Sequence, residues 1–245
     1  MRGRMACRLA GVIVGLASIP VVAAAQATDI SDRPTQENDN AVFNYTRLEL
    51  DAGRRAGSGE GSWTGEGWIG RDYDRVWWKT RGDVEEGALA DVEGQVAYGR
   101  YIAPFWDLQA GYRRTVRPVG ENFLVLGIRG LAPYRFDVSA EAFLSGHGRV
   151  SARGEANWEL LWTNWLISRP GFSADVFAMN DPTLRQRAGI GDVEVRLPTR
   201  YEFSRQFAPY AELRYNHRSG AIADVIGRGA SPSGWSVRGG VWLIF

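Results

Sequence analysis

Sulfur-containing and imidazole side chains are scarce in this sequence of 245 residues, which holds one Cys, three Met and two His. A single Cys excludes an intramolecular disulfide scaffold. The 29 Lys and Arg balance the 28 Asp and Glu, so the chain lacks the cationic surplus needed to bind phosphate backbones, and we expect no nucleic-acid partner. What the sequence does have is 30 Gly and 10 Trp.

The first 25 residues have the pattern of a secretory signal peptide. Arginines precede an apolar run from Leu9 to Val22, and Ala23 to Ala25 supply small residues for cleavage. The run is shorter than the roughly 20 apolar residues of a spanning helix, which disfavours the alternative of a membrane anchor. We predict a signal peptide at 1–25, after which the chain keeps no Cys and one Met, Met179.

Residues 26–41 are polar and show no apolar period, so they predict a flexible periplasmic arm. No later segment is long and apolar enough to predict a spanning helix. Any membrane insertion of the remaining chain would therefore need strands.

From about residue 42 onward, apolar and polar residues alternate, as in strands with one apolar and one polar face. The clearest example is residues 134–145, and the pattern recurs in 90–102, 105–117, 150–162, 192–203 and 235–245. These stretches are longer than the usual strand of about 5 to 6 residues.

Recurring turn signals divide the alternating region into about twelve strands. Proline motifs at 103–105, 132–134, 169–172 and 208–210, together with residues 71–75, predict short turns on one side. Gly-rich or polar connections predict loops on the other side, at 54–61, 81–87, 117–121, 145–149, 179–189 and 217–234.

Alternation by itself does not distinguish a membrane barrel from a soluble lipocalin-like or sandwich sheet with one wet face. Strand length suits a tilted span of about 9 to 11 residues. The final strand ends on Phe245 with apolar residues at alternate positions, which is typical of outer-membrane barrels. Aromatic residues near strand ends resemble an interfacial girdle: Trp77, Trp78, Phe105, Trp106, Tyr134, Trp158, Trp162 and Trp165. We predict an all-β, antiparallel, up-and-down transmembrane β-barrel across residues 42–245, in a Gram-negative outer membrane.

Three segments resemble a known family: residues 100–114 (RYIAPFWDLQAGYRR), residues 123–156 and residues 200–220. They are similar to copper resistance protein B, an outer-membrane protein of Gram-negative copper-tolerance systems. The resemblance extends from about Asn44 to Phe245. It implies a barrel that binds copper and contributes to copper sequestration or export, alongside a periplasmic multicopper oxidase.

The sequence departs from this family in its possible copper ligands. Family members typically carry a Met- and His-rich amino-terminal segment, whose thioethers suit Cu(I) and whose imidazoles suit Cu(II). Here no Met or His occurs from Gln26 to Gly146. The remaining candidate ligands are His147, Met179 and His217, all in predicted loops on the same side. The alternative is that these three are ordinary loop residues.

A second candidate surface consists of the polar residues that alternate with the apolar ones along each strand and would face the barrel lumen. It comprises Asp91, Glu93, Asp107, Asp137, Glu141, Glu155, Glu159, Asp192, Glu194, Glu202 and Glu212 with Arg113, Arg135, Arg153, Arg196, Arg200, Arg214 and Arg238. Carboxylates attract Cu(II) weakly, and interleaved arginines pair with them as cross-strand ladders. We predict an ion-pair lining that fills or narrows the lumen. A barrel of twelve strands is intermediate between barrels of about eight strands, whose interior is filled by side chains, and porins of about sixteen strands, whose channel is open.

An enzymatic function has little support. A serine hydrolase needs Ser, His and an orienting Asp or Asn within hydrogen-bond reach. His147 lies near Ser145, and His217 follows Asn216, but neither accompanies a GxSxG motif. The sequence therefore predicts a non-enzymatic barrel that binds or passes copper. The alternative is a general pore or structural barrel without a copper site.

Overall fold

Long antiparallel strands make up almost all of the computed structural model, which describes residues 41–55, 58–117, 119–180, 188–218 and 233–245. The predicted signal peptide and residues 26–40 of the predicted arm lie outside the described residues. The elements are β1 (Phe43–Arg55), β2 (Ser58–Gly70), β3 (Asp74–Glu85), β4 (Ala88–Ala103), β5 (Trp106–Arg117), β6 (Glu121–Ala132), η1 (Pro133–Arg135), β7 (Phe136–Ser145), β8 (Val150–Trp158), β9 (Leu160–Leu161), β10 (Leu166–Ser168), β11 (Gly171–Phe177), β12 (Gly189–Tyr201), β13 (Phe207–Arg218) and β14 (Ser233–Ile244).

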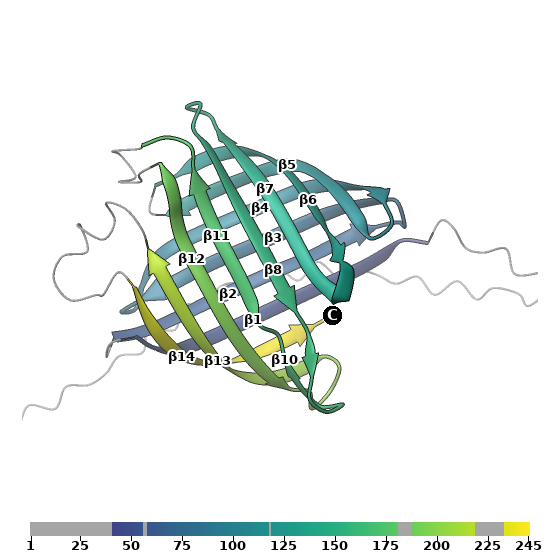
Figure 1. Ribbon diagram of the computed structural model, residues 1–245, viewed down its shortest axis with the longest axis vertical. Helices are drawn as coiled ribbons and strands as arrows, with labels where there is room; N and C mark the ends of the chain where they lie inside the picture. The colour runs from purple at the N-terminus through teal and green to yellow at the C-terminus, as the bar shows by residue number, and fades with distance from the viewer. Residues whose placement is uncertain (1–40, 56–57, 118, 181–187, 219–232) are drawn as a thin grey trace, which may run out of the picture. The chain divides into compact units, whose positions relative to one another are not determined.

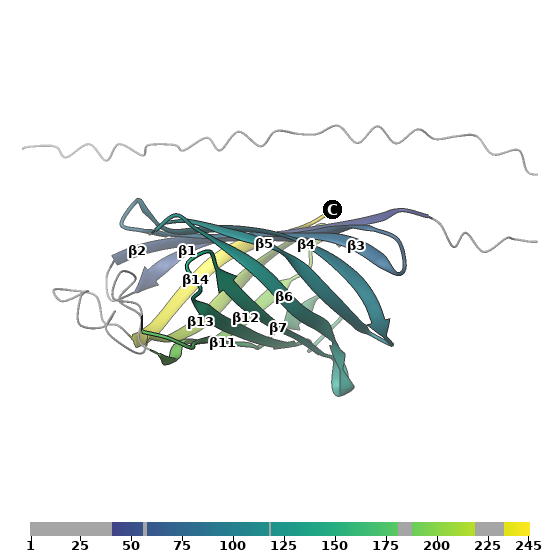
Figure 2. The same ribbon diagram turned by 90° about the horizontal axis from the view of Figure 1, so that it is seen from above.

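The strands form one closed sheet (Figure 1). Strands that follow one another in the sequence pair side by side, and β1 pairs with β14 to close the ring. Segments β8 and β9 form one strand interrupted at Glu159, and β10 and β11 form another interrupted at Arg169 and Pro170. The described residues therefore build the predicted 12-strand antiparallel barrel. In Figure 2, strands β2 and β4 lie in one wall of the barrel and β11 and β12 in the other.

The alternation in sequence separates an apolar outer wall from a polar interior. On β7, Glu141 is 7% exposed, whereas its outward neighbour Leu144 is 45% exposed. Across the described residues, buried polar side chains outnumber buried apolar ones, and large apolar side chains are exposed on most strands. A soluble protein has the opposite distribution. This inverted pattern fits a barrel in lipid and excludes the soluble sheet considered above.

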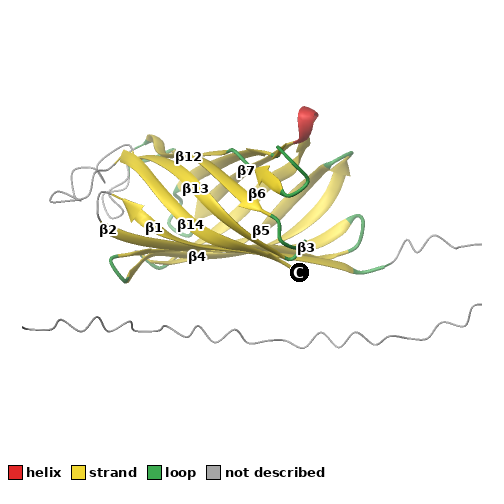
Figure 3. Cartoon of the chain, turned by 90° about the horizontal axis from the view of Figure 1, so that it is seen from below, coloured by secondary structure: helices red, strands yellow, loops and turns green. Residues whose placement is uncertain are grey.

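The connections between strands alternate between the two ends of the barrel (Figure 3). Both the start of β1 and the finish of β14 lie at one end, with the turns that follow β2, β4, β6, β9 and β12. We call this the turn end. The connections that follow β1, β3, β5, β7, β11 and β13 lie at the other end, the loop end. The predicted division of turns and loops between the two ends is confirmed.

Two of the four predicted proline turns are wrong. Pro104 lies in a turn and Pro133 in η1, as expected, but Pro170 interrupts a strand and Pro209 lies within β13. Their turns come a few residues earlier, at 162–165 and 202–206. Proline lacks the N–H that a ladder needs, so it is tolerated at a break or near a strand start as well as in a turn.

Two side chains also point elsewhere than predicted. Arg135 was expected in the lumen, but it lies in η1 with φ of 64° and is exposed, because the chain turns there before β7 begins. Trp77 was expected in the aromatic girdle, but it lies inside the barrel and is 8% exposed. None of the described residues belongs to a helix long and apolar enough to cross a membrane.

Candidate functional site

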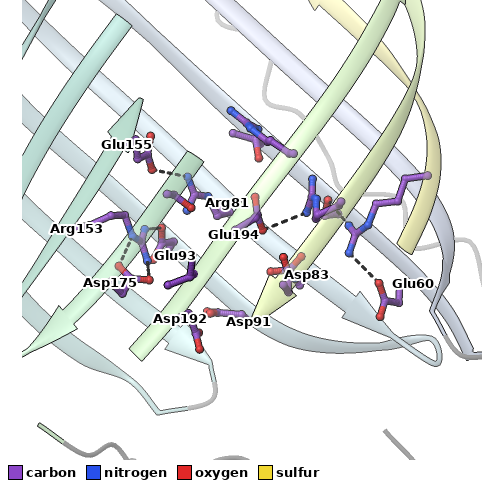
Figure 4. A pocket seen from close by; sticks show the side chains of 18 of the residues that line it. Glu60, Arg81, Asp83, Asp91, Glu93, Arg153, Glu155, Asp175, Asp192 and Glu194 are labelled. Carbon is purple, nitrogen blue, oxygen red and sulfur yellow. Dashed lines mark hydrogen bonds and ion pairs between the residues drawn. The ribbon is translucent and has the colours of Figure 1, made fainter. Parts of the chain in front are cut away.

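At the loop end, acidic side chains dominate a cavity of about 140 Å³. Nine carboxylates line this loop-end vestibule with five arginines: Glu60, Asp83, Glu85, Asp91, Glu93, Glu155, Asp175, Asp192 and Glu194, with Arg81, Arg153, Arg196, Arg214 and Arg238. Figure 4 shows these side chains converging from strands on opposite walls. The excess of carboxylates makes the vestibule negative, which favours cations.

The local structure of β3 and β4 brings two of these acids together. The hairpin turns at Glu86 and Gly87, both with positive φ, and the register shifts between Asp83 and Val84. As a result Asp83 lies directly opposite Asp91. Like charges in such a pair are destabilising, so this arrangement serves the electrostatics of the cavity rather than the stability of the sheet.

Elsewhere in the vestibule, carboxylates are held by buried arginines. Arg238 Nη1 lies 3.0 Å from Asp51 Oδ1, and its Nη2 lies 2.8 Å from Glu60 Oε2. Arg153 Nε lies 2.7 Å from Asp175 Oδ1. Such charge-assisted contacts fix the side chains in place.

Several ion pairs cross the lumen instead of joining neighbouring strands. Lys79 Nζ on β3 lies 2.6 Å from Glu141 Oε1 on β7. Arg81 Nη2, also on β3, lies 3.1 Å from Glu155 Oε1 on β8 (Figure 4). The strands β4, β5 and β6 separate β3 from β7 along the wall. The predicted ladders between adjacent strands do occur, as in Arg113 with Glu93, but they are only part of the lining. We call Lys79, Arg81, Glu141 and Glu155 the crossbar.

At the turn end, arginines stack on tryptophans. The Trp242 ring lies within cation–π distance of Arg200 (4.3 Å), Arg47 (5.0 Å) and Arg169 (5.8 Å). A similar contact of 4.9 Å joins Arg129 to Trp77.

A cavity of about 350 Å³ opens beside the contact between Arg129 and Trp77, and we call it the turn-end vestibule. Its lining includes Arg75, Trp77, Tyr101, Phe105, Asp107, Arg129 and Asp137. Cations and acids are balanced here, and aromatic rings contribute much of the surface. This balance contrasts with the acidic loop end.

The predicted copper ligands all lie at the loop end. His147 lies between β7 and β8 with 79% of its side chain exposed, and its Nδ1 is 3.4 Å from Glu121 Oε1. Met179 follows β11 and is 49% exposed. His217 belongs to β13 instead of the predicted loop, because pairing with β14 extends to Ser233, whose Oγ is 2.9 Å from the His217 ring.

No two of these three residues share a strand or a connection. His147 lies in the connection between β7 and β8, Met179 follows β11, and His217 lies on β13, with β8 and β12 between them along the wall. Within the described ranges, no group of three or more His, Cys, Asp or Glu is arranged to hold a metal ion. Ser145, Glu121 and His147 do meet, but the hydroxyl and the imidazole both contact one oxygen of Glu121. A catalytic triad instead requires the imidazole between the other two groups.

The sequence interpretation missed several lumen residues, including Lys79, Arg81, Asp83, Glu66 and Glu121. Their signal was present, since each shares the inward parity of its strand. In β2, however, glycines occupy many outward positions, which hides the apolar half of the alternation.

Comparison with solved structures defines the class of protein. The barrel resembles the NanC porin with a TM-score of 0.58 and 15% identity, covering 80% of this chain and 98% of that chain. It resembles the KdgM porin with a TM-score of 0.51 and 9% identity, covering 81% of this chain and 99% of that chain. These likenesses concern the fold alone, and they show that the chain has the antiparallel β-barrel fold of these two porins.

Comparison of sequences then defines the family. Residues 40–245 match the family described as Copper resistance protein B precursor. A Copper resistance protein B from Escherichia coli is 33% identical over 194 residues, covering 78% of this chain. A homolog from Pseudomonas syringae pv. tomato is 33% identical over 191 residues, covering 77% of this chain. This chain belongs to the copper resistance protein B family, as the sequence predicted, and it is an outer-membrane protein. It matches about 65% of the length of both relatives.

Proposed function

We propose that this barrel binds copper ions at its loop end and thereby contributes to copper sequestration or export and to copper homeostasis. The observation that supports this best is the excess of carboxylates in the loop-end vestibule, nine against five arginines. In outer-membrane barrels the longer loops are extracellular, so this negative mouth faces the medium. It raises the local concentration of cations before any specific ligand is engaged.

Ligands of different softness lie at the same end. The carboxylates of Asp83 and Asp91 suit Cu(II) as oxygen donors, the imidazoles of His147 and His217 suit Cu(II), and the thioether of Met179 suits Cu(I). Copper is cargo in this proposal. The three predicted ligands act as separate, weak contacts, which fits their placement on different strands.

The proposed partners follow from the family and the fold. Lipid of the outer membrane covers the apolar outer wall. A periplasmic multicopper oxidase of the same resistance system would meet the turn end, where β1 begins and β14 ends.

Copper titration of the folded protein in detergent tests the proposal. Cu(I) and Cu(II) are titrated into the wild type, into His147→Ala/Met179→Ala/His217→Ala and into Asp83→Asn/Asp91→Asn. Asp72→Asn, in an exposed turn at the other end, is the matched control. We expect the triple variant to lose affinity for Cu(I), the double carboxylate variant to lose affinity for Cu(II), and the control to bind as the wild type does.

The second candidate function is a general pore or structural barrel without a specific copper site. The placement of the three candidate ligands on different strands and connections favours it. Wild-type binding no stronger than that of an unrelated barrel poor in methionine would support this function and overturn the copper proposal. Binding that the triple variant retains in full would assign copper to the carboxylates alone.

A further inference from the structure

The lumen consists of two vestibules separated by a narrow waist. Cavities of about 140 Å³ and about 350 Å³ lie toward the loop end and the turn end. Between them is a cavity of only about 30 Å³, and all four crossbar residues line it. Arg81 and Glu155 also line the loop-end vestibule, so they form its floor.

The waist is narrow because charged side chains reach across it. Each crossbar pair begins on β3 and ends on the far wall, on β7 or β8. Gln95 Nε2 on β4 adds a hydrogen bond of 3.1 Å to the same Oε1 atom of Glu141 that Lys79 contacts. The Glu141 carboxylate is therefore held from two strands, and its side chain is 8% exposed.

The size of the waist decides what fits. A cavity of about 30 Å³ has room for only a few water molecules, since one water needs about 10–15 Å³ measured in this way. A hydrated ion carries several waters and is larger than this space. Either the ion sheds its water against the charges of the crossbar, or the crossbar separates.

We propose that the ion pairs Lys79–Glu141 and Arg81–Glu155 close the lumen at mid-height, and that these four side chains determine the size and the charge of any solute that passes. This inference goes beyond copper binding, since it concerns passage through the barrel and holds for any ion. The constriction is also lined by Glu66, Glu93 and Arg153. Removing the two crossbar cations therefore leaves an excess of carboxylates, and removing the two crossbar acids leaves an excess of cations. The two changes should both widen the waist, but with opposite charge selectivity.

Conductance across a planar bilayer tests this closure. We expect Lys79→Ala/Arg81→Ala and Glu141→Ala/Glu155→Ala each to raise the single-channel conductance by about threefold or more over the wild type. In a salt gradient, the first variant should shift the reversal potential toward cation selectivity and the second toward anion selectivity. Arg71→Ala/Arg205→Ala, which removes two exposed cations from turn-end connections, should keep wild-type conductance.

Wild-type protein that conducts as strongly as the crossbar variants would overturn the proposal, and so would two crossbar variants with the same charge selectivity. Failure of the copper titration would leave this result unaffected. Folding of each variant is checked by the faster migration of the unboiled barrel on a denaturing gel.

The sequence offers an independent measurement, because Lys79 is its only lysine. Acylation of Lys79 by an amine-reactive reagent, followed by mass spectrometry, reports access to the waist in the intact barrel. We expect slow labelling in the wild type and about tenfold faster labelling in Glu141→Ala, where the ammonium loses its carboxylate partner. Equal labelling rates in the wild type, in Glu141→Ala and in unfolded protein would show an open waist and contradict the proposal.

Discussion

The two ends of the lumen use arginine in different ways. At the loop end, arginines pair with carboxylates, and the acids remain in excess. At the turn end, Arg47, Arg169 and Arg200 stack on Trp242, which is 4% exposed. The loop end therefore presents charge to its cavity, whereas the turn end uses charge and aromatic surface together as packing. We expect substitutions at the turn end to have the largest effect on the stability of the barrel. Substitutions at the loop end should mainly change the charge of its cavity.

The largest effect is expected at Trp242. Trp242→Ala removes the ring that contacts three guanidinium groups and leaves a cavity, so we expect the free energy of unfolding to fall by about 3–5 kcal/mol. Urea unfolding in lipid vesicles, followed by tryptophan fluorescence, measures this change. Trp165→Ala is the control, because Trp165 is 56% exposed in a turn, and its loss should cost less than about 1 kcal/mol. Equal losses in both variants would contradict the packing role of the turn end.

An intermediate effect is expected at Arg238, the buried arginine of the loop end. Arg238→Ala leaves the Asp51 carboxylate without this cation, and we expect a loss of about 2 kcal/mol, below the 3–5 kcal/mol of a dry interior because the vestibule holds water. Adding Asp51→Asn should restore part of the loss, since it removes the buried negative charge that Arg238 balances in the wild type. The same unfolding experiment applies. A loss larger than that of Trp242→Ala would reverse the comparison between the two ends.

The smallest expected effect is a gain, instead of a loss, in the free energy of unfolding. Asp83→Asn/Asp91→Asn removes two like charges that lie opposite each other on β3 and β4. We expect the barrel to gain about 0.5–1 kcal/mol at neutral pH. The gain should vanish on acidification, because protonation removes the same repulsion in the wild type. A matched change of one acid, Asp72→Asn in the exposed turn between β2 and β3, should leave the stability within about 0.5 kcal/mol of the wild type.

The alternation of polar and apolar residues predicted the barrel, because successive side chains of every strand point in turn toward the lumen and toward lipid. In β7, Asp137, Ser139 and Glu141 face the lumen and the residues between them face outward. Local exceptions escaped prediction, since a positive φ at Arg135 turns the chain out of the strand pattern. The proline motifs were equally ambiguous, because Pro133 and Pro209 both lie in an Ala-Pro-Tyr tripeptide, but Pro133 lies in η1 and Pro209 lies within β13.

The candidate site was less predictable than the fold. Parity identified many inward acids and arginines, but it gave partners only on adjacent strands. Which distant strands face one another depends on the tilt and stagger of the closed barrel. For this reason the crossbar, with Lys79 on β3 and Glu141 on β7, could not be derived from the sequence. Likewise, the sequence predicted a common end for His147, Met179 and His217, but the distances between them depend on the same tilt and stagger.

The seam between β1 and β14 has a consequence for biogenesis. Thr46 and Phe245 exchange two backbone hydrogen bonds, of 2.9 and 3.0 Å. The backbone groups on this edge of β1 therefore stay unpaired until β14, the last strand, has formed beside it. Until then, β1 exposes an unpaired edge that can join another chain. Contacts so distant in sequence form slowly. The growing chain therefore depends on protection of that edge during its transit to the membrane, and a lesion in β14 would harm assembly before it harmed any later property of the barrel.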